Sequence, residues 1–219
     1  MSHKVHPYAH RLGILRDWKS QWFGVGAKYR QFLKGDVLIR QYLEKKLLDF
    51  FVADVIIERS KKAIRIIIKT SRPGMIIGRN GEGMEKIRKQ LNSFMIKNGI
   101  YDKAIETKVE VEEVRSPESN AKLVGLMVRD ALQKRMPFRR VLKQTVEKVM
   151  ANRDVQGVRI RIGGRLNGAD MARVEDLKKG QIPLQTLRAD IDFARIRATI
   201  PQGDLGIKVW IYRGEVFNK

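Results

Sequence analysis

The sequence predicts an α+β protein made of an N-terminal arm followed by two compact α+β domains. Its 219 residues are about twice the commonest size of a single domain. Helical and strand periodicities alternate in two successive blocks, and Ser116-Pro117 lies between the blocks, where a proline after a strand pattern marks a break. We therefore expect an arm over residues 1–26, a first domain over 27–116 and a second domain over 117–219.

The first domain is predicted to be a three-stranded sheet with helices on one face. Apolar residues at three- and four-residue spacings predict its helices, and β-branched runs or strict alternation predict its strands. The expected elements, in order, are a helix over 27–50, strands over 52–58 and 63–69, a short apolar turn over 75–77, a helix that starts near residue 82, and a strand over 105–114.

The second domain is predicted to consist of two helices packed on a β-sheet. Met136-Pro137 separates the two helices, because proline interrupts helical hydrogen bonding. Strands are expected over 158–162, 187–200 and 207–212, with a short helix near 169–177. The arm over 1–26 shows no regular periodicity, and we expect it to become ordered on binding.

The charge of the chain indicates a polyanionic partner. There are 45 Lys and Arg against 24 Asp and Glu, a net charge of +21. Residues 1–114 carry +10 of this charge and residues 115–219 carry +11. Because so strong a charge repels itself unless a polyanion neutralises it, both halves are expected to contact nucleic acid.

Composition also restricts the compartment. The chain has no cysteine, which excludes disulfides, thiolate nucleophiles and cysteine-based metal sites. The first residues lack the apolar stretch of a secretory signal, and no run approaches about 18 apolar residues. We expect a soluble cytoplasmic protein that makes no contact with a membrane.

Signals for catalysis are missing from the sequence. His3, His6 and His10 lie in the irregular arm without acidic support, which does not favour a metal site. The segment 81–83 lacks the Lys-Ser/Thr of a phosphate-binding loop and the third glycine of a dinucleotide fingerprint. No nucleophile can be matched with a base. We predict no cofactor, no metal and no enzymatic activity.

The segment Gly78-Arg79-Asn80-Gly81 lies between an apolar turn and the start of a helix. Two residues without Cβ let the backbone pass close to a nucleic-acid strand, and a helix start presents free N–H groups to phosphate. This loop and the element order around it resemble a KH domain of type II, which binds RNA. In the alternative interpretation the two glycines only permit a tight turn.

A basic stripe is predicted on the second helix of the second domain. At 100° per residue, Arg139, Arg140 and Lys143 fall in one sector beside the core face of that helix, and Arg135 precedes it. Few acidic residues stand nearby to neutralise these charges. We expect phosphate contacts here; a solvated helix face is the alternative.

Two further groups are candidates for RNA contact. Arg159, Arg161 and Arg165 alternate with apolar residues along a predicted strand, which places the three guanidinium groups on one side of the sheet. A charged edge strand is the alternative. In the arm, Trp18 and Trp22 interleave with basic residues, a pattern suited to base stacking, to packing on a protein or to burial.

Motifs along nearly the whole chain resemble the bacterial-type family of small-subunit ribosomal protein S-three. The resemblance is specific because several motifs occur in one fixed order. They are Lys4-Val5-His6-Pro7, Arg11-Leu12-Gly13-Ile14, residues 18–23, Arg72-Pro73-Gly74, the loop Gly78–Gly81 with Glu82, residues 138–143, Gly163-Gly164-Arg165-Leu166, residues 186–192 and residues 206–211.

This resemblance implies an rRNA-binding component of the small-subunit head that lines the channel through which mRNA enters and assists its unwinding. In that family, the residues matching Arg139, Arg140 and Lys143 are assigned to a helicase activity driven by translocation. Implied partners are small-subunit rRNA, mRNA and small-subunit proteins four, five, ten and fourteen. The expected rRNA-binding residues are Lys4, Arg11, Trp18, Trp22, Arg159, Arg161 and Arg165.

Two other functions remain open at this point. A free-standing KH-domain regulator of mRNA would share the Gly-x-x-Gly loop and the positive charge, and it would be found outside ribosomal particles. A basic lyase would need a lysine with a lowered pKa, and no lysine in the sequence has a visible reason for one.

Overall fold

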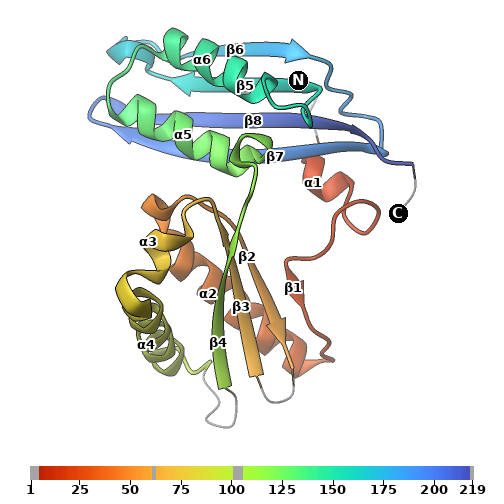
Figure 1. The fold of residues 1–219 in the computed structure, drawn as a ribbon, viewed down its shortest axis with the longest axis vertical. Helices are drawn as coiled ribbons and strands as arrows, with labels where there is room; N and C mark the ends of the chain where they lie inside the picture. The colour runs from red at the N-terminus through yellow and green to blue at the C-terminus, as the bar shows by residue number, and fades with distance from the viewer. Residues whose placement is uncertain (1–4, 61–62, 101–105, 218–219) are drawn as a thin grey trace. The chain divides into compact units, whose positions relative to one another are not determined.

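The structure is a computed structural model that describes residues 5–60, 63–100 and 106–217 (Figure 1). The chain divides into two compact units, one made of Trp18–Arg115 and the other of Met1–Asp17 together with Ser116–Lys219. The arm expected over 1–26 is therefore not a separate part. Its described residues up to Asp17 belong to the C-terminal unit, and those from Trp18 onward belong to the N-terminal unit.

The N-terminal unit holds a sheet of strand order β1-β2-β3-β4. β2 and β3 form the predicted antiparallel hairpin, and β4 runs parallel to β3. A two-residue strand in the arm, which the sequence did not indicate, pairs parallel with β2. The elements are β1 Ser20–Gln21, α2 Ala27–Lys46, β2 Val52–Arg59, β3 Ala63–Thr70, α3 Pro73–Ile77, α4 Glu82–Lys97 and β4 Glu106–Glu113, with short 3-10 turns at Leu48–Phe50 and Arg79–Gly81.

The long helices of the N-terminal unit cover one face of its sheet. Ile39 and Leu43 of α2 and Leu91 of α4 pack in one buried cluster with Ile57 of β2 and Ile66 of β3. Alternate residues of the strands are buried in this core, where they pack against the apolar faces of the helices. The predicted type II arrangement, with helices on one face, is confirmed.

A buried charged cluster fixes the start of α2 against the sheet. The carboxylate of Asp36 accepts hydrogen bonds from Arg59 (Nε to Oδ1, 2.7 Å) and from the Trp22 indole (Nε1 to Oδ2, 2.6 Å). The side chains of Arg59 and Asp36 are only 6% and 1% exposed. The Trp22 ring also packs against Tyr29 and Phe32. This cluster ties residues of the arm to the core of the unit.

The C-terminal unit is an antiparallel sheet of order β6-β5-β8-β7 with α5 and α6 on one face. Its core joins Val124 and Val128 of α5 and Val146 of α6 to inward residues of the strands. The elements are α1 Pro7–His10, α5 Ala121–Gln133, α6 Phe138–Met150, β5 Gly157–Gly164, β6 Arg173–Gly180, β7 Ala189–Ile200 and β8 Gly203–Glu215, with 3-10 turns at Pro117–Ser119 and Leu166–Gly168.

The helix predicted near 169–177 is wrong. Arg173–Gly180 forms β6, which pairs along its whole length with β5, so that Asp176 lies opposite Arg161 and Leu177 opposite Ile160. The segment has little apolar periodicity of its own, and its backbone hydrogen bonds come from the free side of β5. Tertiary pairing therefore overrides local propensity here.

Neither a membrane-spanning helix nor a metal-binding cluster occurs among the described residues. None of the helices in the part of the chain that the structure describes is long and apolar enough to cross a membrane. The same residues contain no group of three or more His, Cys, Asp or Glu side chains that could hold a metal ion.

Candidate nucleic-acid interface

The Gly-x-x-Gly loop is exposed and has a left-handed backbone. Gly78, Asn80 and Gly81 have φ values of 71°, 50° and 81°, a region that glycine adopts freely and asparagine tolerates. Arg79 and Asn80 are both exposed, and neither side chain has a hydrogen bond or ion pair within the described ranges. The loop therefore offers a cation, an amide and the free N–H groups of the α4 start to a ligand.

Part of this loop also serves the fold. A Cβ on Gly78 would lie 3.1 Å from the Gly83 nitrogen, and a Cβ on Gly83 would lie 2.4 Å from the Ile76 carbonyl oxygen. Gly83 thus lets α4 start against the end of α3, a role that sequence reasoning missed. The signal was the third glycine of Gly78-x-x-Gly81-x-Gly83. A Cβ on Gly81 would meet nothing within 4 Å, so space does not require a glycine there.

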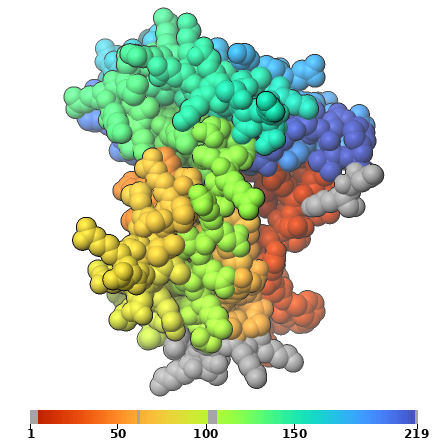
Figure 2. All heavy atoms as spheres, viewed as in Figure 1, coloured from red at the N-terminus to blue at the C-terminus, as the bar shows by residue number. Residues whose placement is uncertain are grey.

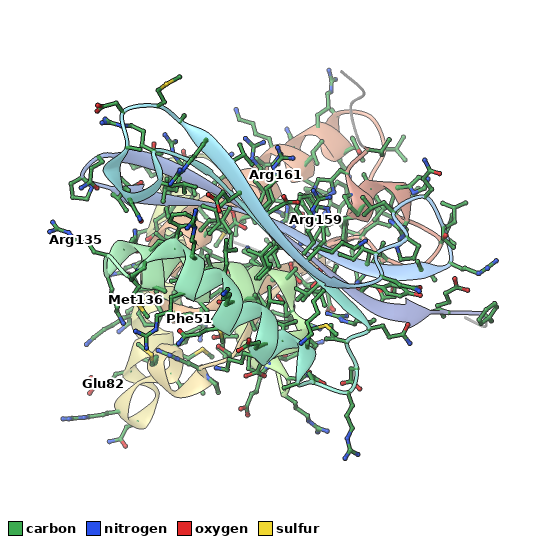
Figure 3. The ribbon with its side chains drawn as sticks, turned by 90° about the horizontal axis from the view of Figure 1, so that it is seen from above. Phe51, Glu82, Arg135, Met136, Arg159 and Arg161 are labelled. Carbon is green, nitrogen blue, oxygen red and sulfur yellow. The ribbon has the colours of Figure 1, made fainter. Side chains whose placement is uncertain are left out.

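The turn between α5 and α6 holds Arg135 in an unfavourable backbone conformation. α5 ends with hydrogen bonds from the Arg135 N–H to the Leu132 carbonyl (2.9 Å) and from the Met136 N–H to the Ala131 carbonyl (3.1 Å). In such an ending the first residue after the cap is left-handed and is usually glycine. Here that residue is Arg135, with φ 59°, and its exposed side chain stands at the end of the helix (Figure 3).

The predicted stripe on α6 is present and is largely unneutralised. Arg139, Arg140 and Lys143 are exposed, while Leu142 and Val146 of the same helix are buried. Residues 138–150 lie at the surface of their unit in Figure 2. Arg139 has one ion pair with Glu175, at 3.7 Å. Arg140 and Lys143 have none in the described part of the chain.

Positive side chains gather at the N-terminal end of α6, which is also the positive end of the helix dipole. Its N-cap is Pro137, which makes no side-chain hydrogen bond, and the first turn contains no acidic residue. Arg139 and Arg140 lie in this first turn, although cations are favoured at the opposite end of a helix. Free backbone N–H groups and two guanidinium groups therefore form one region suited to phosphate.

An open hollow of ≈ 320 Å³ lies beside this turn. Its wall includes Met136, Phe138, Leu166 and Gln202, with Arg135 among the lining residues. The hollow is lined by both polar and apolar side chains and is bordered by a cation. It was not foreseen because its walls come from three loops that are distant in the sequence.

Arg159 and Arg161 lie on β5, but Arg165 follows the end of this strand, so the three arginines do not share one side of a strand as predicted. Arg159 donates to Asp176 (Nε to Oδ2, 2.8 Å), and its guanidinium lies 5.5 Å from the Trp210 ring. Arg165 donates to the carbonyls of Ala169 and Gln202 and so ties two loops together. Of these three arginines, only Arg161 is both exposed and without a side-chain partner among the described residues.

Two of the arm candidates are occupied inside the protein. Arg11 is 0% exposed and donates to the carbonyls of Leu184 (3.0 Å) and Thr186 (2.8 Å), and burial lowers its pKa. Trp22 donates to Asp36. A buried guanidinium and a packed indole are not available to rRNA, so we remove both from the proposed contacts. Trp18 is 65% exposed, and Lys4 lies outside the described residues.

A second basic hollow, also unforeseen, lies on the helices of the N-terminal unit. Tyr42 of α2 stacks on Phe94 of α4 with ring centroids 4.4 Å apart, and Lys46, Lys89 and Lys97 line the same hollow. These residues meet only because α2 and α4 pack side by side.

The fold and the exposed cations together define the class of the protein, a nucleic-acid-binding protein with a KH-like domain.

The comparisons with known proteins divide the chain in the same way. Residues 38–119 match the family described as KH domain, and residues 128–211 match the family described as Ribosomal protein S3, C-terminal domain.

Relatives match over the whole chain. A protein of Xanthomonas euvesicatoria pv. vesicatoria (strain 85-10), named small ribosomal subunit protein uS3, is 42% identical over 218 residues, which are 100% of this chain and 86% of the relative. Relatives with the same name from Endomicrobium trichonymphae and Ligilactobacillus salivarius are also 42% identical and are covered to 90% and 94% of their length, against 100% and 99% of this chain.

The chain belongs to the uS3 family of small-subunit ribosomal proteins. This confirms the family that the motifs resembled, and it makes the ribosome the location of the protein. The family is one of ribosomal structural proteins, so the predicted class of a ribosomal protein rather than an enzyme is confirmed.

Proposed function

We propose that this protein binds small-subunit rRNA in the subunit head, among small-subunit proteins four, five, ten and fourteen. In the same proposal it lines the channel through which mRNA enters. There Arg135, Arg139, Arg140 and Lys143 bind the phosphates of incoming mRNA and assist the opening of structured messages. The rRNA contacts include the loop Gly78–Gly81, Trp18, Arg159, Arg161, Arg165 and Lys4.

The observation that carries the mRNA proposal is the charge at the turn between α5 and α6. Arg135 occupies a position where glycine is favoured, and Arg139 and Arg140 occupy a helix end where anions are favoured. Residues that break local preferences without a gain in the fold are expected at functional sites. In this proposal, these residues instead provide a surface that binds phosphate.

The chemistry of this surface is binding, not bond cleavage. Guanidinium groups hold phosphate oxygens with charge-assisted hydrogen bonds, and Lys143 adds a point charge one turn further along α6. Contacts to phosphate are independent of sequence, as a channel that admits every message requires. Separated strands held in this way cannot pair again, and the energy for opening comes from movement of the mRNA through the ribosome.

The test replaces Arg139, Arg140 and Lys143 with Ala. Exposed substitutions change stability by within about 0.5 kcal/mol, so the protein is expected to fold and to enter subunits. Translation of a message with a stable hairpin should slow, while an unstructured message of equal length is translated at the normal rate. Lys148→Ala is the matched control, because Lys148 of the same helix already pairs with Glu118.

Two results would contradict this role. Equal slowing on both messages would show a general grip on mRNA or a defect of assembly. No slowing on either message would make the α6 stripe an ordinary solvated surface.

The loop Gly78–Gly81 is tested with Arg79→Asp and Asn80→Asp together. Aspartate tolerates the left-handed backbone of Asn80, so the fold is expected to persist. Two carboxylates at the site of a phosphate should lower crosslinking of the loop to rRNA in assembled subunits, with an unchanged melting temperature of the free protein. A large loss of stability with normal crosslinking would assign the loop to the fold alone.

A further inference from the structure

Three cations lie directly opposite one another on the sheet of the C-terminal unit. Arg161 of β5 pairs in register with Lys208 of β8, and Lys208 pairs in register with Arg195 of β7. Residues opposite one another in an antiparallel pair share one face of the sheet. All three are exposed. We call Arg161, Lys208 and Arg195 the cation row.

The cation row lies on the face of the sheet away from α5 and α6. Ile160 and Ile162 of β5 and Ile207 and Val209 of β8 alternate with the cations and are buried together with these helices. Figure 3 shows Arg159 and Arg161 on the side of the sheet opposite α6. The row is therefore not covered by α5 or α6; on the same face, His6 beside α1 packs on Phe193, and the row itself stays exposed.

No carboxylate neutralises the cation row. Asp176 stands opposite Arg161 in β6, but its carboxylate is held by Arg159. Asp204, near the start of β8, is held by Arg197. In residues 5–60, 63–100 and 106–217, none of the three cations of the row has a hydrogen bond or an ion pair.

Such an arrangement lowers the stability of the free protein. Like charges directly opposite one another destabilise a sheet, whereas opposite charges stabilise it. A bound anion would reverse the sign of this contribution, because each cation would gain a partner.

Bare backbone borders the cation row on one side. Two residues further along β5 and β8, Gly163 lies opposite Gly206, on the same face as the row. A Cβ on Gly206 would have only the Gly163 carbonyl oxygen within 4 Å, at 3.9 Å, whereas a Cβ on Gly163 would lie 3.2 Å from the Val174 side chain, so the open space is above Gly206. Glycine in the interior of a strand is typical of sites where a ligand approaches the backbone closely.

We propose that the cation row is a second RNA-binding site, which holds successive phosphates of an rRNA strand that crosses the sheet beside Gly163 and Gly206. With strands about 4.8 Å apart, the row extends about 10 Å across the face, long enough for more than one phosphate. The proposal rests on the proposed function in that the ligand is rRNA and Arg161 is one of its proposed contacts, and it adds Lys208, Arg195 and the open backbone beside them. Its residues are separate from those of α6.

The geometry favours RNA over an acidic protein segment. An extended peptide that binds a sheet adds to a free edge, where backbone N–H and C=O groups are unpaired. Two of the three cations, Arg161 and Lys208, stand on β5 and β8, which are interior strands of the order β6-β5-β8-β7, and only Arg195 stands on an edge strand. A strand of nucleic acid instead lies across a sheet face and needs only side-chain cations and room for its backbone.

The test compares the wild-type full chain with a variant that carries Arg161→Thr, Arg195→Thr and Lys208→Thr, since threonine is uncharged and favours strands. Binding to a fluorescent single-stranded oligouridine is followed by anisotropy at several salt concentrations. Loss of three phosphate contacts should make the slope of log K against log salt less negative by about 2.

The matched control removes the same number of charges at paired positions, with Arg65→Thr, Lys148→Thr and Arg188→Thr. Each of these cations already has a carboxylate partner. The control should change the slope by much less, which separates local contact from the effect of net charge. At low salt the row variant should also melt at a higher temperature than the wild type, and this gain should vanish at high salt.

An unchanged slope in the row variant, equal to that of the control, would overturn the proposal even if the melting temperature rises. Weaker binding to polyglutamate with unchanged binding to oligouridine would also overturn it and assign the row to an acidic protein. The α6 variant measured beside them keeps the two proposals apart: a reduced slope there with none in the row variant removes only the second RNA site.

Discussion

The exposed faces of the two sheets use charge in opposite ways. In the N-terminal unit, Asp54, Lys69 and Glu112 lie opposite one another across β2, β3 and β4, so that acid, base and acid alternate. Lys69 pairs with Glu112 at 3.4 Å. In the C-terminal unit, the corresponding row on β5, β8 and β7 is three cations. Both units are basic, but among the described residues only the C-terminal unit leaves this row of cations without side-chain partners on its sheet.

The comparison teaches that net charge does not locate a binding surface. Arg59 and Arg65 in the N-terminal unit are occupied by Asp36, Glu58 and Glu110, and they contribute to the fold. At Arg135, Arg139 and Arg140 the cations instead stand where the local structure disfavours them. Burial among internal partners, as at Arg59, rather than the number of charges, marks a cation that serves the fold.

The largest loss of stability is expected at the buried ion pair of the N-terminal unit. Asp36→Ala leaves Arg59 buried without its carboxylate and the Trp22 N–H without its acceptor, which should lower the free energy of unfolding by about 3–5 kcal/mol. Urea unfolding followed by circular dichroism measures this loss. Glu112→Ala, at an exposed pair, is the control, and a similar loss in both variants would show that the buried cluster has no special importance.

Exchanging the two charge patterns tests the comparison directly. Lys208→Glu should raise stability by about 1 kcal/mol, since a carboxylate would stand between Arg161 and Arg195, and it should weaken RNA binding. Lys69→Glu places three carboxylates in one row and should lower stability by a similar amount. Thermal unfolding at low salt measures both changes. Equal shifts of the same sign in the two variants would contradict the comparison.

A substitution in the turn between α5 and α6 is expected to change stability by a similar or smaller amount. Arg135→Gly removes a side chain from a left-handed position and should stabilise the protein by about 1 kcal/mol. Binding of single-stranded RNA should weaken at the same time. Lys134→Gly, at the preceding position, does not have a left-handed backbone and should lower stability. Stabilisation without weaker binding would remove Arg135 from the proposed site.

The smallest expected effect is on how the stability of the N-terminal unit depends on pH in acid. A hydrogen bond from Arg65 lowers the pKa of Glu110 below its ordinary value of 4.5. The interaction is fully present above the ordinary pKa and is lost as the pH falls through the lower pKa of the folded state. Arg65→Gln should therefore flatten the loss of stability below about pH 4.5. An acid transition identical to that of the wild type would show that this pair does not contribute.

Local sequence determined the elements whose periodicity is strong. The helices α2, α4, α5 and α6, the hairpin β2–β3 and the break at Met136-Pro137 follow from apolar spacing and from proline, because these signals act within a few residues. The Gly-x-x-Gly loop and the order of the motifs likewise identified the domain type and the family from residues adjacent in the chain.

Tertiary structure alone decided which side chains are free. Residues 173–180 became a strand because β5 offered a free edge, and Arg11 became a structural group because carbonyls from 184 and 186 surround it. Arg161, Lys208 and Arg195 became neighbours only through the register of three strands. Each outcome depends on pairing between segments far apart in the chain, and local periodicity carries no information on such pairing.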